Sequence, residues 1–449
     1  MSSDTLYAQD TIVAAATAPG TGGVAMVRIS GAAAADIGRA MLGKLPKPRV
    51  ASIKTFVAKN REPIDQGLAL WFPAPGSFTG EDVLELHGHG GPIVVANLIA
   101  AAVDFGARRA EPGEFSRRAF LNDKLDLAQA EAIADLIASG TNQAARAALR
   151  TLSGEFSRAV NELLEQLIRL RLHVEAAIDF PEEEIDFLSD QALLEQIDKV
   201  RAAFDSLQDR ASAGRVLRDG LQVVIVGRPN AGKSSLLNVL SGQDAAIVTE
   251  VAGTTRDILR ERIDIDGLLV ELVDTAGLRE DPDRIEAEGI RRAREALKNA
   301  DAVLWIIDAS ADEKNAAPPE PLPDNVPVLH VYNKIDLQQR DRTAIGSNAV
   351  LLSAKTGEGI DKLRTEIKRL AGVGDIGEGS FTARQRHLDA LTRARESFDS
   401  GVDALQKARA GEILAEELRL AQEALGEITG RFTSDDLLGR IFSEFCIGK

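Results

Sequence analysis

Cysteine is almost absent from this sequence of 449 residues, since Cys446 is the only one. A single thiol cannot close a disulfide within the chain, and without further cysteines or clustered histidines it cannot form a structural zinc site. Proteins of oxidising compartments commonly carry disulfides. The lack of cysteine therefore favours a reducing compartment, and we expect a cytoplasmic protein.

Long apolar runs are also absent, and none approaches the ~18 residues that a membrane-spanning helix needs. The first residues, MSSDTLYAQD, carry acids where a secretory signal carries bases. Cys446 followed by three residues has the outline of a prenylation signal, but the last of these is Lys449 and no polybasic run precedes them. We therefore expect no membrane anchor.

Basic residues are in the minority, because 53 Lys and Arg stand against 69 Asp and Glu, for a formal net charge of -16. This charge repels a nucleic-acid backbone on average, so any RNA contact must come from a local basic patch. The strongest basic helical segment is RRAREALK, residues 291–298, although a solvated helix face is the simpler interpretation of it.

Three regions of the chain differ in their hydrophobic pattern. Up to about residue 122, short apolar runs such as GVAMVRIS and DVLELHG alternate with Gly and Pro turns and precede a helical run, PIVVANLIAAAVDFG. From 124 to about 220, and again after about 372, apolar residues recur at helical spacing. They are Leu152, Phe156, Val160, Leu163, Leu164 and Leu167 in the first block, and Leu414, Leu418, Ala421, Leu425 and Ile428 in the second.

The region between the two helical blocks has a different pattern. Its runs LQVVIVG, LLVELVD, AVLWIID, VPVLHVY and AVLLSA are rich in Val, Ile and Leu and are typical of a parallel sheet covered on both faces. We therefore predict a multi-domain protein with an N-terminal α+β domain at 1–122 and a helical bundle domain at 123–219 plus 373–449. A P-loop α/β domain at 220–372 is inserted into the bundle.

A phosphate-binding motif opens the inserted domain. Residues 227–234, GRPNAGKS, match G-x-x-x-x-G-K-[ST] between a strand and a helical run, which is the context that the motif requires. Lys233 can reach the β and γ phosphates, and Ser234 can ligate Mg²⁺. Asp274 ends the strand LLVELVD, where it can hold the Mg²⁺ water shell, while Gly277 can donate its N–H to the γ phosphate.

The base-binding motifs identify the nucleotide. Asn333 and Asp336 of NKID follow a strand, at the sheet edge where ligands bind. A carboxylate there pairs with the N1 and N2 donors of guanine, and adenine offers no such amine. Ser353, Ala354 and Lys355 complete the pocket by analogy with related GTPases. The sequence therefore predicts a GTP-binding domain.

The hydrolytic machinery departs from that of Ras-like proteins. Leu278 follows DTAG, where those proteins place the glutamine that orients the attacking water. Another group must hold the water. Asn230 of the P-loop, beside the loop GTTRD at 253–257, is either the ligand of a monovalent cation or an ordinary P-loop residue, and spacing alone leaves both open.

The motifs GRPNAGKSSLLN, AGTTRD, DTAGLR, NKID and FCIGK, with GTGGVAMVRISG, FTGEDVLELHGHGGP and EPGEFSRRAFLNDKLDLAQ near the start, together resemble the MnmE (TrmE) family of tRNA-modifying GTPases. The resemblance covers essentially the whole chain. It implies a folate-binding, dimerising N-terminal domain, and a GTPase domain that dimerises around K⁺. It also implies a heterotetramer with the FAD-dependent protein MnmG, which modifies carbon 5 of the wobble uridine (U34) of certain tRNAs.

The resemblance assigns ligands to the nucleotide site. It makes Asn230, Thr249, Val251 and Thr254 the K⁺ ligands, and Ser234 and Thr255 the Mg²⁺ ligands. The water-orienting acid falls on Glu286, with Glu288 as the competing candidate and solvated helix surface as the alternative for both. The complete set of expected GTP contacts is Asn230, Ala231, Gly232, Lys233, Ser234, Ser235, Thr249, Glu250, Val251, Ala252, Gly253, Thr254, Thr255, Asp274, Thr275, Ala276, Gly277, Asn333, Lys334, Asp336, Ser353, Ala354 and Lys355.

The resemblance also implies a site for a tetrahydrofolate derivative, either the 5,10-methylene or the 5-formyl form, that donates one carbon. Its residues are Arg28, Glu85, Lys124 and Lys449. A carboxylate suits the pterin edge and cations suit the glutamate carboxylates of folate, although structural salt bridges would use the same residue types. His87 and His89 have no ligands at metal spacing, so a role in a turn is the simpler interpretation.

The C-terminal segment TSDDLLGRIFSEF predicts a helix with Ser434 as its cap and an apolar face. The face comprises Leu437, Leu438, Ile441, Phe442 and Phe445. Docked by this face, the helix would hold Cys446 and Lys449 in a fixed place. Both a catalytic and a packing role for Cys446 stay open, so the candidate catalytic residues are Glu286, Lys233 and Cys446.

Two functions are compatible with these motifs. The first is a potassium-activated GTPase that acts with MnmG in tRNA modification. The alternative is an RNA-associated GTPase switch in ribosome assembly, which would use the same five nucleotide motifs. The acidic charge and the lack of a recognisable RNA-binding appendage count against the alternative.

Overall fold

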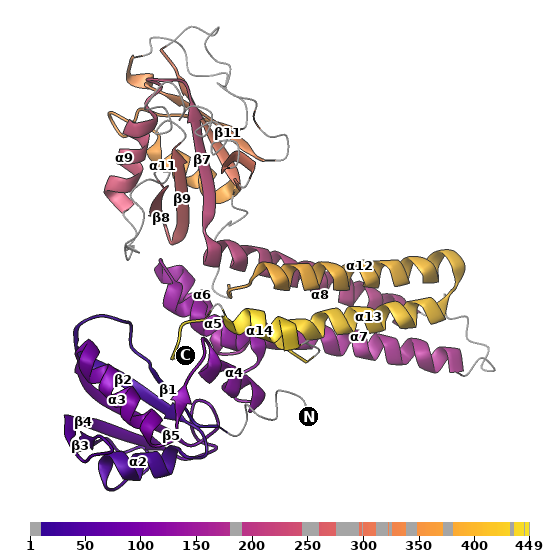
Figure 1. Cartoon of the computed structure of the whole chain (residues 1–449). Coiled ribbons are helices and arrows are strands. Elements are labelled where there is room, and N and C mark those ends of the chain that lie inside the picture. Colours follow the sequence, from indigo (N-terminus) through magenta and orange to yellow (C-terminus); the bar gives the residue numbers. More distant parts are fainter. Residues whose placement is uncertain are drawn as a thin grey trace, which may run out of the picture. The chain divides into compact units, whose positions relative to one another are not determined.

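A computed structural model describes residues 10–179, 191–244, 260–274, 296–298, 300–310, 322, 326–337, 348–370, 380–431, 435–443 and 445–448. Figure 1 shows the whole chain, which divides into two compact units. The first unit comprises Met1–Ala134 with Leu418–Lys449, and the second comprises Asp135–Glu417. This division falls within two helices and does not separate the P-loop region from the bundle, so the three domain ranges given above stay a prediction. Among the described residues, no helix is both long and apolar enough to cross a membrane.

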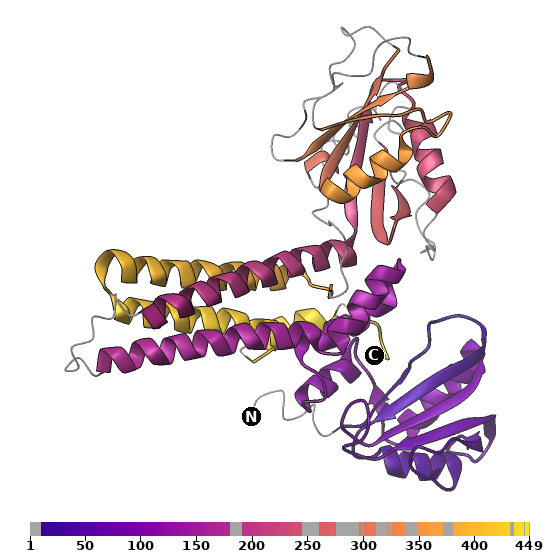
Figure 2. The same cartoon turned by 180° about the vertical axis from the view of Figure 1, so that it is seen from behind.

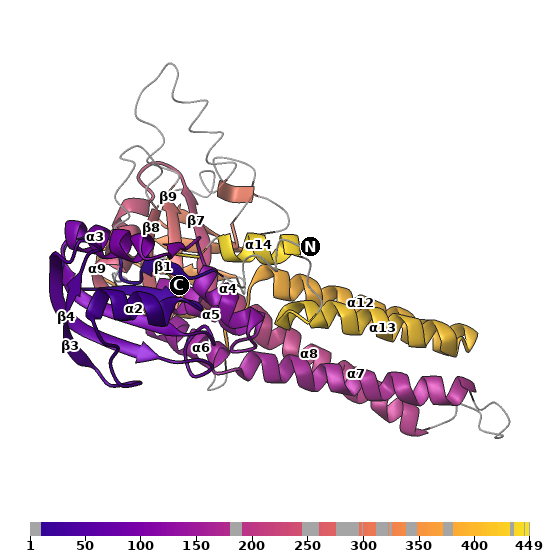
Figure 3. The same cartoon turned by 60° about the horizontal axis from the view of Figure 1, so that its bottom comes forward.

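The first unit is built on a six-stranded sheet with the order β3-β4-β5-β2-β1-β6. Its strands are β1 (Ile12–Ala15), β2 (Gly22–Ser30), β3 (Ser52–Val57), β4 (Pro63–Phe72), β5 (Val83–Gly90) and β6 (Arg108–Arg109). Neighbouring strands are antiparallel, except that β1 and β6 run parallel. Figure 3 shows β3 at the outer edge of this sheet.

Two helices cover one face of the sheet, namely α2 (Ala34–Leu42) and α3 (Pro92–Asp104). Alternate residues of the strands point to this face, as in β2, where Val27 and Ile29 are fully buried. They pack with Ile37 and Met41 of α2 and Leu98 of α3 in one core. This layer confirms the α+β fold that the sequence predicts for the N-terminal region.

The rest of the first unit joins the N-terminal region to the C-terminal end of the chain. It contains α4 (Glu114–Leu121), most of α5 (Leu127–Ala138), the second half of α13 (Gly411–Thr429) and α14 (Asp435–Ser443). The apolar face predicted for the C-terminal helix is confirmed, because its residues pack against Phe120, Leu127 and Ala130. Its proposed cap, Ser434, lies outside the described residues.

The second unit contains three long helices that run side by side, α7 (Glu155–Asp179), α8 (Gln191–Asp219) and α12 (Gln385–Ala408), together with the shorter α6 (Asn142–Leu152) (Figures 1 and 2). Aromatic residues bind these helices together. The Phe204 and Phe398 ring centroids lie 5.5 Å apart, and Phe156 stacks on Phe381 at 4.6 Å. The helical bundle predicted on both sides of the insertion is therefore confirmed.

The second unit also contains a six-stranded sheet with the order β12-β11-β10-β7-β9-β8. The strands are β7 (Leu221–Gly227), β8 (Arg260–Ile265), β9 (Leu268–Asp274), β10 (Ala302–Asp308), β11 (Val328–Asn333) and β12 (Ala349–Leu351). All pairings are parallel except that of β8 with β9. With α9 (Lys233–Asp244), η3 (Ile335–Leu337) and α11 (Ile360–Leu370), this is the expected P-loop α/β fold.

Candidate functional site

The P-loop connects β7 to α9 and is shaped by two residues with left-handed backbone angles. Asn230 has φ of 62° and Gly232 has φ of 95°. A Cβ at Gly232 would lie 2.2 Å from Asn333 Nδ2, so glycine is required here by both conformation and space. The turn places the N-terminus of α9 at the end of β7, which is an anion-binding arrangement.

Lys233 lies at the first position of α9 and is 7% exposed. Its ammonium Nζ donates to the carbonyl oxygens of Gly227 at 2.8 Å and Arg228 at 3.0 Å, so it is held over the loop. Ser234 and Ser235, which follow it, are exposed at the helix start, and Ala231 is buried. The structure thus gathers the predicted P-loop residues around one turn.

Asn333 joins the P-loop to the base-binding loops. It is 2% exposed and donates from Nδ2 to the carbonyl oxygen of Ala231 at 3.0 Å. Its Oδ1 accepts from the backbone N–H groups of Lys334 at 2.8 Å and Ala354 at 3.0 Å. One buried amide therefore joins its own loop to two others, because its bonds to Ala231 and Ala354 reach the P-loop and the loop after β12.

Asp336 is exposed at the same edge of the sheet, and its Oδ1 accepts from Ser353 Oγ at 2.6 Å. Ser353 is fully buried, and its Oγ also accepts from the N–H of Thr356 at 3.2 Å. These bonds fix the carboxylate of Asp336 while leaving its second oxygen able to accept from a ligand. Lys355, the last predicted base-pocket residue, is exposed beside it.

Asp308 is a site residue that the sequence analysis did not identify. It ends β10 next to Asn333 of β11, and its Oδ2 accepts from Lys334 Nζ at 2.7 Å. Partial burial acts to raise the pKa of Asp308, but hydrogen bonds from Lys334 and Ser310 outweigh it, so the pKa lies below its ordinary value. The pair fixes the ammonium of Lys334, a residue whose φ is 66°, at the end of β10.

Other predicted nucleotide residues lie outside the described part of the chain. These are Thr249, Glu250, Val251, Ala252, Gly253, Thr254, Thr255, Thr275, Ala276, Gly277, Glu286 and Glu288. The basic segment 291–298 is described only in its last three residues. Asp274 is the last residue of β9, and only its backbone is described.

A second cluster of predicted residues lies in the first unit, on the face of the sheet that α2 and α3 leave open. Arg28 of β2 faces Glu85 of β5, and its Nε donates to Glu85 Oε1 at 3.0 Å. The two side chains are only 15% and 14% exposed. The guanidinium carbon of Arg28 lies 5.3 Å from the Phe78 ring centroid and 5.7 Å from that of Phe115, so apolar rings border the ion pair.

The other predicted folate residues differ in their placement. Lys124 is exposed and donates from Nζ to the carbonyl oxygen of Pro75 at 3.0 Å, in the loop that also carries Phe78. Lys449 lies outside the described residues. The histidines have ordinary partners, since His87 lies 3.4 Å from Glu85 and His89 pairs with Asp65 at 2.8 Å. Among the described residues, no group of three or more His, Cys, Asp or Glu side chains could hold a metal ion.

The C-terminal tail docks beside this cluster. Cys446 is exposed, its carbonyl oxygen accepts from the N–H of Gly113 at 3.4 Å, and Ile447 forms an isolated bridge with Pro112. A Cβ at Gly448 would lie 2.0 Å from the carbonyl oxygen of Ala15, so the tail lies against the end of β1. Since β1 pairs with β2 in the register Ala14 to Arg28, the tail approaches the strand that carries Arg28.

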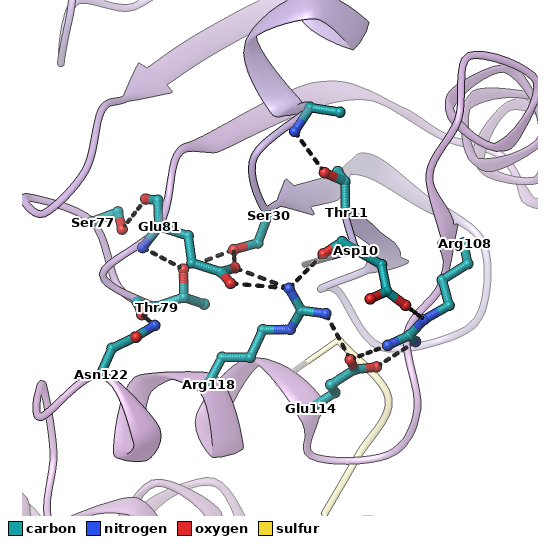
Figure 4. Close-up of polar contacts among 11 residues, drawn as sticks. Asp10, Thr11, Ser30, Ser77, Thr79, Glu81, Arg108, Glu114, Arg118 and Asn122 are labelled. Atoms are coloured by element: carbon teal, nitrogen blue, oxygen red, sulfur yellow. Dashed lines mark hydrogen bonds and ion pairs between the residues drawn. The ribbon is translucent and has the colours of Figure 1, made fainter. Parts of the chain in front are cut away.

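An ion network lies next to the tail (Figure 4). Glu114, whose side chain is 6% exposed, accepts two hydrogen bonds from Arg108, at 2.8 and 2.5 Å, and one from Arg118 at 2.9 Å. Arg118 also donates to Glu81 at 3.0 Å, and Arg108 to Asp10 at 2.6 Å. Burial acts to raise the pKa of Glu114, but the bonds from Arg108, the Glu111 N–H and Arg118 outweigh it and lower the pKa.

The network borders a pocket of about 450 Å³ in the first unit. The pocket lies between α4 and α14 and is lined by Glu81, Glu111, Pro112, Glu114, Arg117, Arg118, Leu121, Asn122, Gly439, Phe442 and Ser443. Arg28, Glu85 and Lys124 are not among its lining residues. The network and the Phe78 and Phe115 rings were missed by the sequence analysis, although the stretch EPGEFSRR carries three of these residues, Glu114, Phe115 and Arg118.

Known proteins resemble the chain along its whole length. Residues 11–124 match the family described as GTP-binding protein TrmE N-terminus, and residues 127–446 match the MnmE helical domain. The tRNA modification GTPase MnmE of Stutzerimonas stutzeri (strain A1501) is 57% identical over 452 residues, which cover 98% of this chain and 99% of that protein.

Solved structures give shorter matches. The G domain of the T. maritima FeoB iron transporter is 25% identical and covers 34% of this chain and 98% of its own, with a TM-score of 0.25. A Sulfolobus solfataricus GTP-binding protein in complex with GDP is 20% identical and covers 46% and 66%, with a TM-score of 0.26. TM-scores this low carry no argument about the family. The family assignment rests on the two family matches and on the relative with 57% identity. The chain belongs to the MnmE (TrmE) family of tRNA modification GTPases.

Proposed function

We propose that this chain binds and hydrolyses GTP and couples the hydrolysis to the modification of tRNA. The observation that supports this most is the buried amide of Asn333, which bonds both to the P-loop at Ala231 and to the base loop at Ala354. A nucleotide bound at this edge of the sheet would contact the P-loop with its phosphates and the base loop with its base, and Asn333 fixes these two loops relative to each other. Family membership indicates tRNA modification, and counts against a switch in ribosome assembly.

The described residues divide the recognition of GTP among themselves. The N–H groups of the P-loop and the ammonium of Lys233 offset phosphate charge, and the free oxygen of Asp336 accepts from the N1 and N2 donors of guanine. Ser234, exposed at the start of α9, would hold Mg²⁺ together with Thr255. When bound, Mg²⁺ would neutralise charge on the β and γ phosphates.

Potassium is the proposed activator. Asn230, at the left-handed turn of the P-loop, would hold K⁺ together with Thr249, Val251 and Thr254. When bound, K⁺ would supply the positive charge that an arginine finger supplies in other GTPases, where it is worth about 10³ to 10⁵ in rate. Glu286 would orient the attacking water, since Leu278 cannot.

The ion and the acid can be tested together by measuring GTP turnover in KCl and in NaCl at equal ionic strength. We expect much faster turnover in KCl, and Glu286→Ala should lower the KCl rate by about 10² to 10⁴. Glu288→Ala is the matched control and should keep the rate. Equal rates in both salts would refute the cation role of Asn230, and an unchanged rate for Glu286→Ala would refute the role of that acid.

We also propose that Arg28, Glu85, Lys124 and Lys449 bind a tetrahydrofolate derivative, in its 5,10-methylene or 5-formyl form, that supplies the one-carbon unit. Support comes from the desolvated Arg28–Glu85 pair between two phenyl rings, where a carboxylate could serve a pterin edge. Cys446 lies on the docked tail, where it has either a direct role in the transfer or a packing or positioning role.

Equilibrium dialysis of 5-formyltetrahydrofolate against the full chain tests this site. We expect saturable binding that Glu85→Gln weakens at least tenfold, because the replacement removes the negative charge. Asp36→Asn, at an exposed ion pair of the same unit, should leave binding unchanged. A Glu85→Gln protein that bound as tightly as the wild type would exclude the site.

Assembly completes the proposal. The chain would form a homodimer, and with the FAD-dependent protein MnmG it would form a heterotetramer. This complex would add a carboxymethylaminomethyl or aminomethyl group to carbon 5 of U34, and it would act in the cytoplasm. The open face of the first sheet supports self-association, because Val24, Ile53 and Leu68 on it are 66%, 72% and 42% exposed. Leu68→Glu should shift the mass measured by light scattering from that of a dimer to that of a monomer. A variant that remained a dimer would contradict the assignment of this face as the interface.

A further inference from the structure

We propose that residues 44–61 of the first unit, here called the basic edge segment, bind the phosphate backbone of the tRNA. The inference rests on the proposed function in tRNA modification. The segment, KLPKPRVASIKTFVAKNR, carries six cations, namely Lys44, Lys47, Arg49, Lys54, Lys59 and Arg61, and no acid. With 69 acids in 449 residues, an average stretch of 18 would carry about three (69 × 18/449). The segment is therefore opposite in charge to the chain as a whole.

The charges of the basic edge segment are not neutralised within the described part of the chain. Five of the six cations are exposed and Lys54 is half-buried. None of them makes an ion pair with a described carboxylate. Arg49 donates to the carbonyl oxygen of Gly76 at 2.6 Å and Lys59 to that of Asp104 at 3.2 Å, and these are neutral acceptors. By contrast, Arg28, Arg108 and Arg118 of the same unit all pair with carboxylates.

The segment lies along an ordered edge. It runs from the connection after α2, through the edge strand β3, into the turn before β4 (Figures 1 and 3). The connection is fixed to β4, because Pro48 forms a bridge with Trp71 and the N–H of Arg49 donates to the Trp71 carbonyl oxygen at 2.8 Å. The six residues of β3 alone span about 20 Å, which is long enough to follow several phosphates of an RNA strand.

Simpler explanations cover only part of the pattern. A lysine on an edge strand discourages pairing with other edges, but that accounts for Lys54 only, because the other five cations lie in the flanking loops. The nearby acids also have partners of their own, since Asp36 pairs with Arg39, Glu62 with Asn60 and Asp65 with His89. A row of exposed cations along one edge fits a polyanion of evenly spaced charges, and tRNA is the polyanion that the proposed function supplies.

The test uses the full chain with Lys44, Lys47 and Lys59 all replaced by Gln. None of the three side chains bonds to a described side chain. The matched control replaces Lys199, Lys362 and Lys407 by Gln, which removes the same charge from exposed positions of the second unit. Binding of a fluorescently labelled tRNA transcript with an unmodified wobble uridine is followed by anisotropy from 50 to 300 mM KCl, a range chosen for the large salt effect on such contacts.

We expect the edge variant to bind the transcript at least tenfold more weakly than the wild type. Its slope of log K against log [KCl] should be smaller in magnitude by about two to three, as expected for three lost phosphate contacts. The control variant should bind like the wild type, and all three proteins should hydrolyse GTP equally.

Three results would overturn the inference. They are unchanged tRNA binding by the edge variant, an equal loss in the control variant, and competition by polyglutamate as effective as that by tRNA at equal charge, which would indicate an acidic protein partner instead. A wild type that did not hydrolyse GTP would contradict the proposed function but not the role of the basic edge segment in tRNA binding. A failure of the proposed function is therefore distinguishable from a failure of this inference.

Discussion

Replacing Glu114 by Gln should destabilise the first unit strongly. The carboxylate of Glu114 is 6% exposed and accepts from two arginines and from the backbone N–H of Glu111. Glutamine has nearly the same shape, but it is neutral and its NH₂ group would face a guanidinium. The guanidinium groups of Arg108 and Arg118 would then lose one of the carboxylates that offset their positive charges, at a position that is largely shielded from solvent.

The size of the expected loss in stability depends on the carboxylate partners that Arg108 and Arg118 still have in the variant. Removing one partner of a buried ion pair typically costs about 3 to 5 kcal/mol. Arg108 still has Asp10 and Arg118 still has Glu81, at 2.6 and 3.0 Å, so we take the lower end, about 3 kcal/mol. With an m-value of about 2 kcal/mol/M for urea, the unfolding midpoint should fall by about 1.5 M.

The assay can isolate the first unit, because the chain has only two tryptophans, one in each unit. In a Trp305→Phe background, the fluorescence of Trp71, which is 7% exposed in the core of the first sheet, reports the unfolding of this unit alone. Asp36→Asn is the control, because its ion pair with Arg39 is exposed and should contribute less than about 1 kcal/mol.

The effect should depend on pH with a defined sign. The pKa of Glu114 is lower in the folded chain than its ordinary value of 4.5, so its stabilisation is complete above that value and is lost as the pH falls further. The difference between the wild type and Glu114→Gln should therefore be constant near pH 7 and shrink below pH 4.5. Equal midpoints at pH 7 would refute the argument that this network stabilises the first unit.

Two glycine replacements test the remaining sites. Gly232→Ala would place a Cβ 2.2 Å from Asn333 Nδ2 at a φ of 95° and should weaken GTP binding, measured by calorimetry, by about 100-fold, or about 2.7 kcal/mol. Gly242→Ala, whose Cβ has open space, should leave GTP binding unchanged, and equal affinities would contradict the assigned P-loop geometry. Gly448→Ala would place a Cβ 2.0 Å from the Ala15 carbonyl oxygen and should release the tail, so that 5-formyltetrahydrofolate binding falls while GTP hydrolysis stays. Gly439→Ala in α14, where the added Cβ has open space, is the control. Unchanged folate binding by Gly448→Ala would show that the docked tail does not contribute to the folate site.

The sequence predicted the elements whose burial follows a regular period. Strands β2 and β5 alternate buried and partly exposed residues, and β7 is almost wholly buried, so each has a recognisable pattern. The edge strand β3 was not identified, because Phe56 is its only buried residue and its other positions carry no periodic signal. The strand β6 has only two residues, which is too short for a pattern, and β8 was missed because charged residues alternate with its two buried isoleucines, Ile263 and Ile265.

The chemistry of the sites was predictable where a motif fixes both residue type and position. Asn333 was assigned to the base pocket from NKID, but its bond to Ala231 was not foreseen, because it joins positions 102 residues apart. Asp308 ends an ordinary apolar strand and gains its role only from Lys334, on the neighbouring loop. Glu114 and Arg118 are typical surface residues in sequence, and only the fold buries them together.

The most direct measurement is equilibrium binding of GTP, ATP and xanthosine triphosphate to the purified chain and to its Asp336→Asn variant. The wild type should bind GTP at least 100-fold more tightly than ATP, because only guanine donates to the fixed carboxylate of Asp336. In the variant the amide can donate to the oxygen at C2 of xanthine, so the preference should move from GTP to xanthosine triphosphate. A wild type that bound ATP as tightly as GTP, or a variant with unchanged preference, would contradict the assignment of this edge as a guanine-nucleotide site.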